Sequence, residues 1–487
     1  MLKKLRYLCF ICLVFSLVSC SAMGNYYYDA SMMPEDMENT EEYNEISERG
    51  FVSPLTNPRS NFSLDSSSYA YSNIRRLIEN NEYISKDAVV IEQMLNYFNY
   101  SYKNETSEAL SSTIEIADCP WNSQHNLALI SVNATELVME NTKNNFVFLI
   151  DVSGSMESSN KLGLVQESFK LLLESVGEDD TISIVTYASS DRIVLDGVKG
   201  SEKLQIRNAI EELTAGGSTN GSGGIQKAYE LAEKHFIKGG NNRVLLATDG
   251  DFNVGISSQA LLNEFISLKR LSGVYLTVLG FGMGNTKHNT METLASKGNG
   301  NAYYIDSALE AKKVFVSELG SVLNTVAKDS KIQVEFNPDV VNKYRLLGYE
   351  NRMMSDAEFE DSNTDAGEIG AGHTTIAIYE IELKDTSSFD YILKTTLRYK
   401  DPTTDVDKEV VNVAKELSIA SEDYKFAACV AEFGLILRNS TYKGDASYEH
   451  LLYVLSTLDL TDEYRLEFKE LVTHAYTNYK LNPNMYE

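Results

Sequence analysis

The chain has 487 residues, of which 43% are hydrophobic and 23% are charged, with only 7 prolines. This composition is typical of globular domains and excludes a wholly disordered, collagen-like or coiled-coil chain, and the length is enough for about three domains. The 70 acidic and 43 basic residues give a net charge of −27. Because an acidic surface repels phosphate backbones, nucleic acid is not an expected partner.

The N-terminus has the features of an export signal. Three basic residues among the first six precede an apolar stretch over residues 7–18, which is too short to span a bilayer as a mature helix. The stretch ends in Leu-Val-Ser before Cys20, which resembles the bacterial lipobox, whose cysteine is lipid-modified and becomes the mature N-terminus. We therefore expect residues 1–19 to be a lipoprotein signal peptide and Cys20 to anchor the protein in a bacterial cell envelope. In a Gram-negative cell this means the outer membrane, facing the periplasm or the surface.

The next residues separate the anchor from the folded part. Residues 20–60 are acidic and then rich in Ser, Asn and Pro, with no buried periodicity, so we expect a flexible tether. Residues 61–143 are expected to form an N-terminal flanking domain. Apolar residues recur at helical spacing over 71–98, and apolar and polar residues alternate like strands over 112–138.

The middle of the chain, residues 144–328, alternates strands with helices. Its first strand, Phe146-Val147-Phe148-Leu149-Ile150, is continuously apolar, which is typical of a strand covered on both faces. Further strands are predicted at 181–187, 244–247, 274–279 and 303–305. Helices are predicted at 162–176, 203–213, 224–237, 258–271 and 308–327. This alternation predicts an α/β fold with a doubly wound parallel sheet.

Beyond residue 328 the chain is expected to form a C-terminal domain, 329–487, of strands and then helices. The strands are predicted at 331–336, 374–383, 391–399 and 409–413. From about residue 421 the pattern gives three helical segments. Since strands lie on both sides of the α/β unit, we expect them to pair into one β-sandwich into which that unit is inserted.

Two cysteines, Cys119 and Cys429, remain in the mature chain. They form a disulfide in an oxidising compartment or stay as two buried free thiols, and their spacing does not decide between these. No Cys/His cluster has the spacing of a zinc site. The six histidines lie in no signature context for nucleophilic catalysis.

Oxygen-bearing side chains follow the first buried strand of the α/β unit. Asp151, Ser153 and Ser155 alternate in a tight loop, at the carboxyl end of a strand where doubly wound sheets bind ligands. Thr219 lies in a glycine-rich loop that opens a helix, and Asp249 follows the strand at 244–247. Carboxylate and hydroxyl oxygens are hard ligands that suit Mg²⁺ or Mn²⁺.

The order Asp-x-Ser-x-Ser, Thr, Asp resembles the metal-ion-dependent adhesion site of von Willebrand factor type A (VWA) domains. The flanks also resemble a bacterial family of VWA lipoproteins, the YfbK-like type, through Cys119-Pro120-Trp121-Asn122 and the motifs at 61–64, 91–98, 347–352 and 442–448. The resemblance covers nearly everything after residue 60. It implies that a Mg²⁺ ion (or Mn²⁺ or Ca²⁺) at this site captures an Asp or Glu residue of a protein partner.

The expected function is therefore adhesion or scaffolding without catalysis. One alternative is a metal-assisted hydrolase that uses Asp151 and Asp249, which requires a general base that the sequence does not indicate. Another is a structural envelope protein whose metal only stabilises the fold. Loss of partner capture with intact folding in Asp151→Ala distinguishes adhesion from the structural role.

Overall fold

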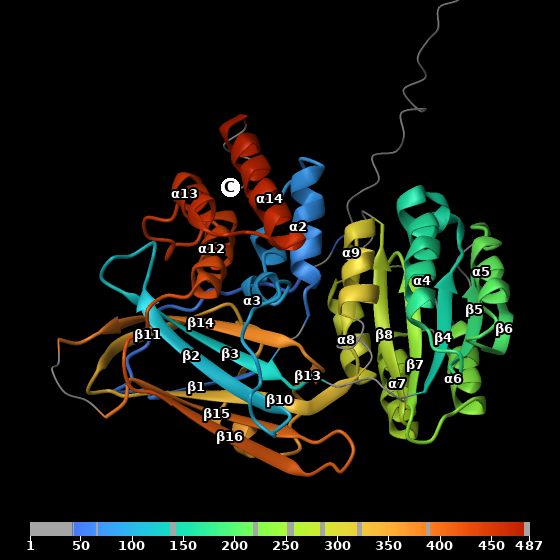
Figure 1. Cartoon of the computed structure of the whole chain (residues 1–487), viewed down its shortest axis with the longest axis horizontal. Helices are drawn as coiled ribbons and strands as arrows, with labels where there is room; N and C mark the ends of the chain where they lie inside the picture. Colours follow the sequence, from blue (N-terminus) through green and yellow to red (C-terminus); the bar gives the residue numbers. More distant parts are fainter. Residues whose placement is uncertain are drawn as a thin grey trace, which may run out of the picture. The chain divides into compact units, whose positions relative to one another are not determined.

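The computed structural model describes residues 41, 43–64, 67–136, 143–217, 223–250, 258–282, 288–318, 324–385 and 390–481. Within these residues the strands form one α/β sheet and the two sheets of a sandwich (Figure 1). In this described part of the chain no helix is both long enough and apolar enough to cross a bilayer. The signal peptide and Cys20 lie outside the described residues.

The α/β sheet has the strand order β6-β5-β4-β7-β8-β9, and its strands are parallel except for β6. The strands are β4 (Asn144–Asp151), β5 (Thr181–Tyr187), β6 (Asp191–Lys199), β7 (Asn241–Thr248), β8 (Val274–Phe281) and β9 (Ala302–Ile305). Every residue of β4 is buried because strands pair with both of its edges and helices cover both of its faces. The predicted doubly wound α/β unit is confirmed.

Successive side chains of β4 enter two different cores. Phe146, Phe148 and Ile150 contact the core that contains α4, α5 and α9, whereas Val147 and Leu149 contact the core that contains α6, α7 and α8. These helices are α4 (Leu164–Ser175), α5 (Lys203–Glu211), α6 (Gly224–Lys234), α7 (Gln259–Lys269), α8 (His288–Lys297) and α9 (Ala308–Lys312). Because successive apolar side chains of β4 point to opposite faces of the sheet, helices cover the sheet on both sides.

Two local predictions in this unit were wrong. The strand β6 was not predicted; it forms an antiparallel edge on β5, with most of its residues exposed or half-buried, so its hydrophobic signal is weak. The predicted helix over 308–327 ends early, because α9 passes into a π-helical turn at Lys313–Ser317 and Thr325–Phe336 is already the strand β10. Pairing of β10 with three other strands overrides the helical pattern of its first residues.

The sandwich is built from strands on both sides of the α/β unit. One sheet has the order β12-β1-β10-β15-β16, with β13 also paired to β10, and the other has the order β11-β14-β3-β2. The ladders β1–β10 and β3–β14 join strands that precede the α/β unit to strands that follow it, as expected. The strands are β1 (Arg59–Ser63), β2 (Leu110–Asp118), β3 (Asn126–Ala134), β10, β11 (Val341–Leu347), β12 (Met353–Met354), β13 (Gly367–Gly370), β14 (Thr374–Leu383), β15 (Leu393–Lys400) and β16 (Asp407–Ala414).

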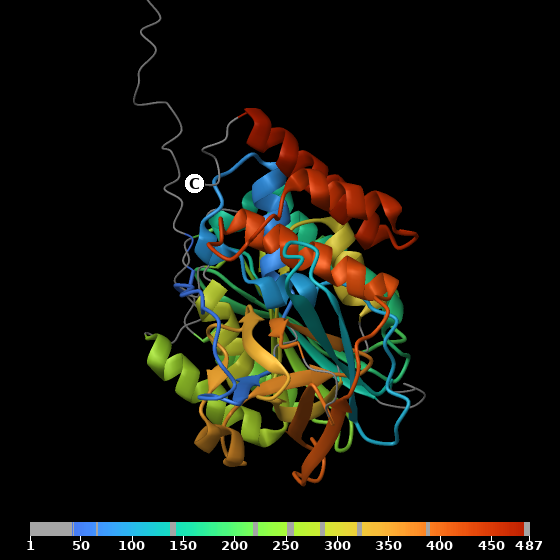
Figure 2. The ribbon, with the colours of Figure 1, turned by 90° about the vertical axis from the view of Figure 1, so that its left-hand side faces the viewer.

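A helical layer covers the outer face of the sheet β11-β14-β3-β2 (Figure 2). It consists of α2 (Tyr69–Glu79), α3 (Ile91–Leu95), α12 (Glu422–Leu437), α13 (Tyr448–Thr457) and α14 (Glu463–Leu481). Within the described residues 421–481 the chain therefore forms three helices, as predicted. Cys119 and Cys429 both lie in this core as buried free thiols, which selects one of the two alternatives for them.

Part of the predicted tether is packed against the fold. Ile46 is buried, Val52 forms a β-bridge with Tyr344, and Glu41 pairs with Arg76 of α2 at 2.6 Å. Residues 41 and 43–60 are therefore not a solvated spacer, and the rest of the predicted tether lies outside the described residues. The prediction failed because these contacts are made by isolated residues that show no sequence periodicity.

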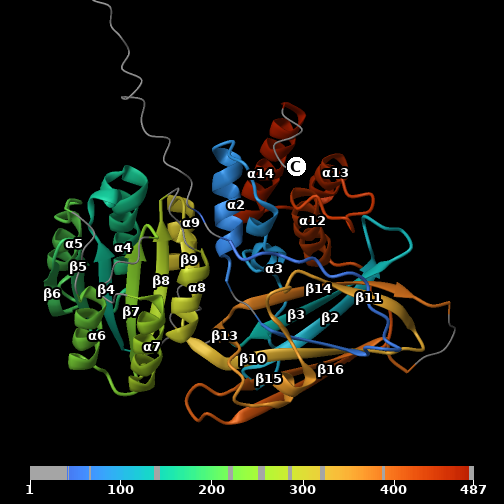
Figure 3. The ribbon, with the colours of Figure 1, turned by 180° about the vertical axis from the view of Figure 1, so that it is seen from behind.

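The helix α2 contacts both α14 and the strand β9 of the α/β unit (Figure 3). At this junction Arg75 of α2 is buried, and its guanidinium donates to Asp306 at 2.5 and 2.8 Å and to Glu310 at 2.8 Å. It also donates to the Tyr97 hydroxyl and lies 3.6 Å from the Glu467 carboxylate of α14. One buried arginine thus connects the α/β unit with the helical layer.

Candidate functional site

The two predicted carboxylates lie side by side at the carboxyl edge of the α/β sheet. Asp151 is the last residue of β4, and Asp249 directly follows β7, which is the parallel neighbour of β4. Both side chains are buried, with at most 1% of Asp249 and none of Asp151 exposed. Adjacent parallel strands end at the same edge of a sheet, which is why the two residues meet although 98 positions separate them.

The two predicted serines form a small hydroxyl pair in the loop after β4. The hydroxyl oxygens of Ser153 and Ser155 lie 2.9 Å apart, and the backbone N–H of Ser153 donates to Asp151 Oδ1 at 2.8 Å. Ser153 is buried and Ser155 is exposed. The hydroxyl pair therefore extends from the buried carboxylate of Asp151 to the protein surface.

The glycine-rich loop is held against this serine loop by two backbone hydrogen bonds. The N–H of Gly216 donates to Val152 O at 2.9 Å, and the N–H of Gly154 donates to Gly217 O at 3.0 Å. Gly217 has a φ of +86°, and a Cβ there would lie 2.4 Å from the hydroxyl oxygen of Ser189, so the approach requires glycine. Thr219, two residues further on, lies outside the described residues.

One oxygen of Asp151 is left for a ligand. Oδ2 is buried, and no hydrogen bond of ordinary geometry reaches it from the described residues, although the Tyr187 hydroxyl is close enough to lower the pKa of the carboxyl. Burial is the largest cause and, aided by the charge of Asp249, raises the pKa of Asp151 to about 6, although hydrogen bonds from Ser153 lower it more than Tyr187 does. Since a buried polar atom without a partner is costly, this oxygen is suited to a cation.

The other carboxylate has a partner that the sequence analysis did not identify. Lys161 Nζ donates to Asp249 Oδ2 at 2.8 Å, and both side chains are at least nine-tenths buried. Lys161 belongs to a π-helical turn, Ser159–Gly163, between the serine loop and α4. Nothing in its sequence neighbourhood distinguishes it from a solvated lysine, so only the fold reveals this contact.

The residues at this edge are compatible with a divalent metal. Asp151 Oδ2 and the paired hydroxyls of the loop that follows are hard oxygen donors, and such donors suit Mg²⁺ or Mn²⁺. Among the described residues no group of three or more His, Cys, Asp or Glu side chains forms a metal site of the carboxylate- or imidazole-rich kind. The candidate site therefore depends on hydroxyls and on few charged donors.

A shallow cavity of about 310 Å³ borders the serine loop on its β5–β6 side. Val152 and Gly216 from the two site loops line it, together with Ser189, Arg192 and Leu213. It thus offers apolar contacts and a guanidinium next to the candidate metal position. This cavity has room for a side chain that neighbours the residue bound at the candidate metal position.

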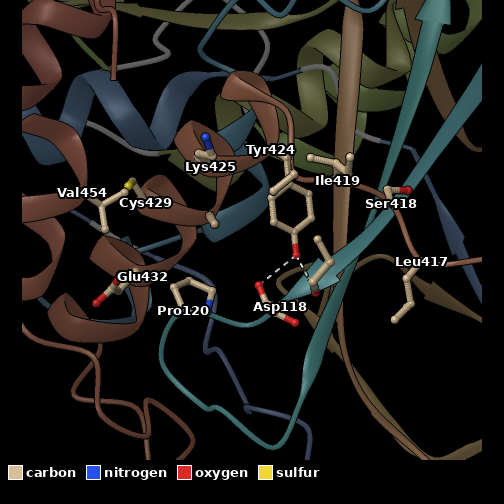
Figure 4. A pocket seen from close by; sticks show the side chains of 13 residues that line it. Asp118, Pro120, Leu417, Ser418, Ile419, Tyr424, Lys425, Cys429, Glu432 and Val454 are labelled. Carbon is tan, nitrogen blue, oxygen red and sulfur yellow. Dashed lines mark hydrogen bonds between the residues drawn. The ribbon is translucent and has the colours of Figure 1, made fainter. Parts of the chain in front are cut away.

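A second cavity, also of about 310 Å³, is formed by residues that are far in sequence from this edge (Figure 4). It is lined by residues of β2, of the segment that precedes α12, of α12 itself and of α13. Cys429 lines it, but burial raises the pKa of this thiol well above its ordinary value, so the thiol is not activated as a nucleophile. Glu432 also lines the cavity, and its carboxylate is hydrogen-bonded to His450, while the Tyr424 hydroxyl lies 2.9 Å from the Ala117 carbonyl oxygen. These groups hold the helices to the sheet and form no catalytic arrangement.

Comparison with known proteins agrees with the architecture. A profile described as von Willebrand factor type A domain matches residues 145–316, and one described as the C-terminal part of the uncharacterized protein YfbK matches residues 321–477. A third, described as von Willebrand factor, matches residues 37–129. In an alignment of 466 residues, which covers 90% of this chain and 81% of that protein, the chain is 38% identical to the uncharacterized protein YfbK of Escherichia coli (strain K12). The chain belongs to the YfbK family.

More distant relatives share only part of the YfbK-like chain. The uncharacterized protein sll0103 of Synechocystis sp. is 27% identical over 40% of this chain and 45% of its own length. Among solved structures, a von Willebrand factor type A protein from Catenulispora acidiphila covers 78% of this chain and 90% of its own, with 16% identity and a TM-score of 0.40. The α/β unit of this YfbK family member is a VWA domain, and such domains are generally interaction modules without enzymatic activity.

Proposed function

We propose that this protein binds a partner protein through a divalent cation held at the carboxyl edge of the VWA domain. The ligands are Asp151, Ser153, Ser155, Thr219 and Asp249, and the cation is Mg²⁺, with Mn²⁺ or Ca²⁺ as substitutes. The observation that carries the proposal is the buried Oδ2 of Asp151, which lacks a hydrogen bond from the described residues, together with the pair of serine hydroxyls in the loop that follows it. A metal of this kind, when bound, supplies an electrophilic centre that accepts one further oxygen ligand.

The further ligand is a carboxylate from an Asp or Glu residue of the partner. The two carboxylates balance the charge of the cation, and Lys161, which is paired with Asp249, leaves the loaded site with a net positive charge, so an anionic oxygen is the preferred last ligand. The chain's net charge of −27 opposes the long-range approach of an acidic partner. Recognition therefore depends on contacts at short range, and the cavity beside Val152 and Arg192 is suited to the residues that flank the captured carboxylate.

The place of action that we propose is the bacterial cell envelope, which in a Gram-negative cell means the outer membrane, facing the periplasm or the surface. The signal-like N-terminus and Cys20 support an exported lipoprotein whose lipid anchors it in the cell envelope. The helical layer contacts the VWA domain through α2, which packs against β9. No catalytic step is part of this proposal.

Affinity purification from solubilised envelope tests the proposal. The bait is the chain from residue 21 onwards, which keeps every described residue, and three arms run in parallel: Mg²⁺, EDTA, and Asp151→Ala with Mg²⁺. A protein that is retained only in the first arm, and whose retention is lost when its own acidic residue is changed to Ala, supports metal-bridged recognition. Identical captures in all three arms contradict it. Loss of folding in Asp151→Ala supports instead a purely structural role for the site.

A further inference from the structure

The strongest unassigned feature next to the candidate site is the buried ion pair between Lys161 and Asp249. The Nζ–Oδ2 distance is 2.8 Å, Asp249 is fully buried and the Lys161 side chain is 10% exposed. A buried ammonium is costly unless a carboxylate neutralises it, so a pair of this kind persists only where the fold holds both groups in place.

The space beside Gly282 accommodates the side chain of Lys161. A Cβ at Gly282, the residue directly after β8, would lie 2.4 Å from Cε, 2.6 Å from Cγ and 2.9 Å from Cδ of Lys161. The lysine stem thus occupies the space that a side chain at Gly282 would need. Gly282 also has a φ of +87°, which disfavours any other residue. The ammonium is therefore directed from the loop after β4 across the end of β8 to the end of β7.

The position of the ammonium determines the charge of the site. Asp151 and Asp249 together with Lys161 leave one net negative charge, whereas the two carboxylates alone would carry two. A divalent cation brings the site with Lys161 to one net positive charge, and it would bring a site without Lys161 only to neutrality. The presence of Lys161 therefore makes the loaded site attractive to a carboxylate and the empty site less attractive to a metal.

We propose that Lys161 is the counter-ion of Asp249 in the metal-free protein, so that a divalent cation that binds must share Asp249 with Lys161. Lys161 thereby weakens cation binding, but it keeps the site with a bound cation positively charged. The inference rests on the proposed function, because it assigns a role to a residue of the same site. In addition to the five proposed ligands, Lys161 is then a residue that positions Asp249 and sets the affinity of the site for the divalent cation.

Calorimetric titration with MgCl₂ at pH 7.5 tests this role on three proteins: the parent chain, Lys161→Met and Lys234→Met. Lys234 is the matched control, because it forms an exposed ion pair with Asp196 at 2.7 Å and its removal changes the net charge equally. We expect Lys161→Met to bind Mg²⁺ about tenfold more tightly or better, since like charge at close range opposes the ion. Lys234→Met should stay within about twofold of the parent, because exposed charges are screened.

A thermal melt in EDTA and in Mg²⁺ provides the second readout. Without metal, Lys161→Met should melt below the parent because Asp249 loses its partner, and Mg²⁺ should raise its melting temperature more than it raises that of the parent. Lys161→Gln, which retains a hydrogen-bond donor but no charge, should show the same gain in Mg²⁺ affinity.

The outcomes separate this inference from the proposed function. If the parent shows no Mg²⁺ binding, the proposed function fails and this inference fails with it. If the parent binds Mg²⁺ while both Lys161 variants bind it equally or more weakly, only the role of Lys161 is refuted. If neither variant folds even in saturating Mg²⁺, Lys161 is a structural residue that the cation does not replace, and the inference is again refuted.

Discussion

Two buried charge clusters of this protein differ in how completely the oxygens of their carboxylates are hydrogen-bonded. At the junction of α2 with β9 and α9, Arg75 donates three short hydrogen bonds to Asp306 and Glu310. At the edge of the VWA sheet, Asp249 is paired with Lys161, but Oδ2 of Asp151 has no hydrogen bond from the described residues. In the first cluster the guanidinium donates to both carboxylates, and in the second one buried oxygen is left without a hydrogen bond from the described residues. The difference supports our proposal that the first cluster holds the fold together and that the second receives a cation.

The largest effect that we expect is on the stability of the junction. Arg75→Met should lower the free energy of unfolding by about 3–5 kcal/mol, because two buried carboxylates lose their counter-ion. Urea denaturation monitored by circular dichroism measures this loss. The control is Arg59→Met, which removes an exposed ion pair with Glu335 and should cost about 1 kcal/mol or less. Equal losses in the two variants would show that the buried cluster has no special role.

Asp151→Asn should have the opposite effect on stability in the absence of metal. The carboxyl pKa is raised from 3.8 to about 6, so burial of the charged form destabilises the fold at pH 7.5. The variant keeps the oxygen that accepts from Ser153 and should be more stable than the parent by about 1–3 kcal/mol in EDTA. Added Mg²⁺ should raise the melting temperature of the parent but not that of the variant. A variant that is less stable in EDTA would show that the charge of Asp151 supports the fold.

Glu467 makes the junction sensitive to pH. Burial is the largest cause that raises its pKa from 4.5 to about 7, while Arg75 and the Tyr71 hydroxyl lower it. Because the folded state binds the proton more tightly than the unfolded chain, this group lowers the free energy of unfolding as the pH rises from about 4.5 to about 7. Glu467→Gln should remove this slope and gain about 1–3 kcal/mol at pH 8. Unfolding curves from pH 4.5 to 8 measure it, and parallel curves for variant and parent would refute the assignment.

The smallest effect on stability is expected at Ser155. Its side chain is exposed, and its hydroxyl contacts that of Ser153. Ser155→Ala should change the free energy of unfolding by no more than about 0.5 kcal/mol, yet it should weaken Mg²⁺ binding because one donor is lost. Urea unfolding and a Mg²⁺ titration of the same preparation provide the two values. Unchanged Mg²⁺ affinity would exclude Ser155 from the site.

Most of the architecture could be predicted from the sequence because the hydrophobic patterns that indicate it lie within short segments of the chain. The apolar run of β4 and the alternation of strands with helices are periodic features, and they predicted the doubly wound sheet. The end of the helix after residue 308 and the edge strand β6 could not be predicted in this way. Their conformation depends on strand pairing with distant residues, such as Thr325 with Gly370 and Thr181 with Lys199.

The candidate site was predictable only in part for a similar reason. Asp151 and Asp249 each follow a strong strand signal, so their meeting at one edge follows from the fold class. Lys161 is ten residues from Asp151 in the chain, and its direction towards Asp249 depends on the space at Gly282, which is set by a third strand. Likewise, the cluster around Arg75 joins α2 to residues more than 200 positions away.

The most direct test of the central claim is an isothermal titration of Mg²⁺ into the metal-free protein and into Asp151→Asn at pH 7.5. The account predicts one binding site in the parent and none in the variant. Equal binding in both proteins, or no binding in the parent, would contradict the claim that the open oxygen of Asp151 receives a divalent cation.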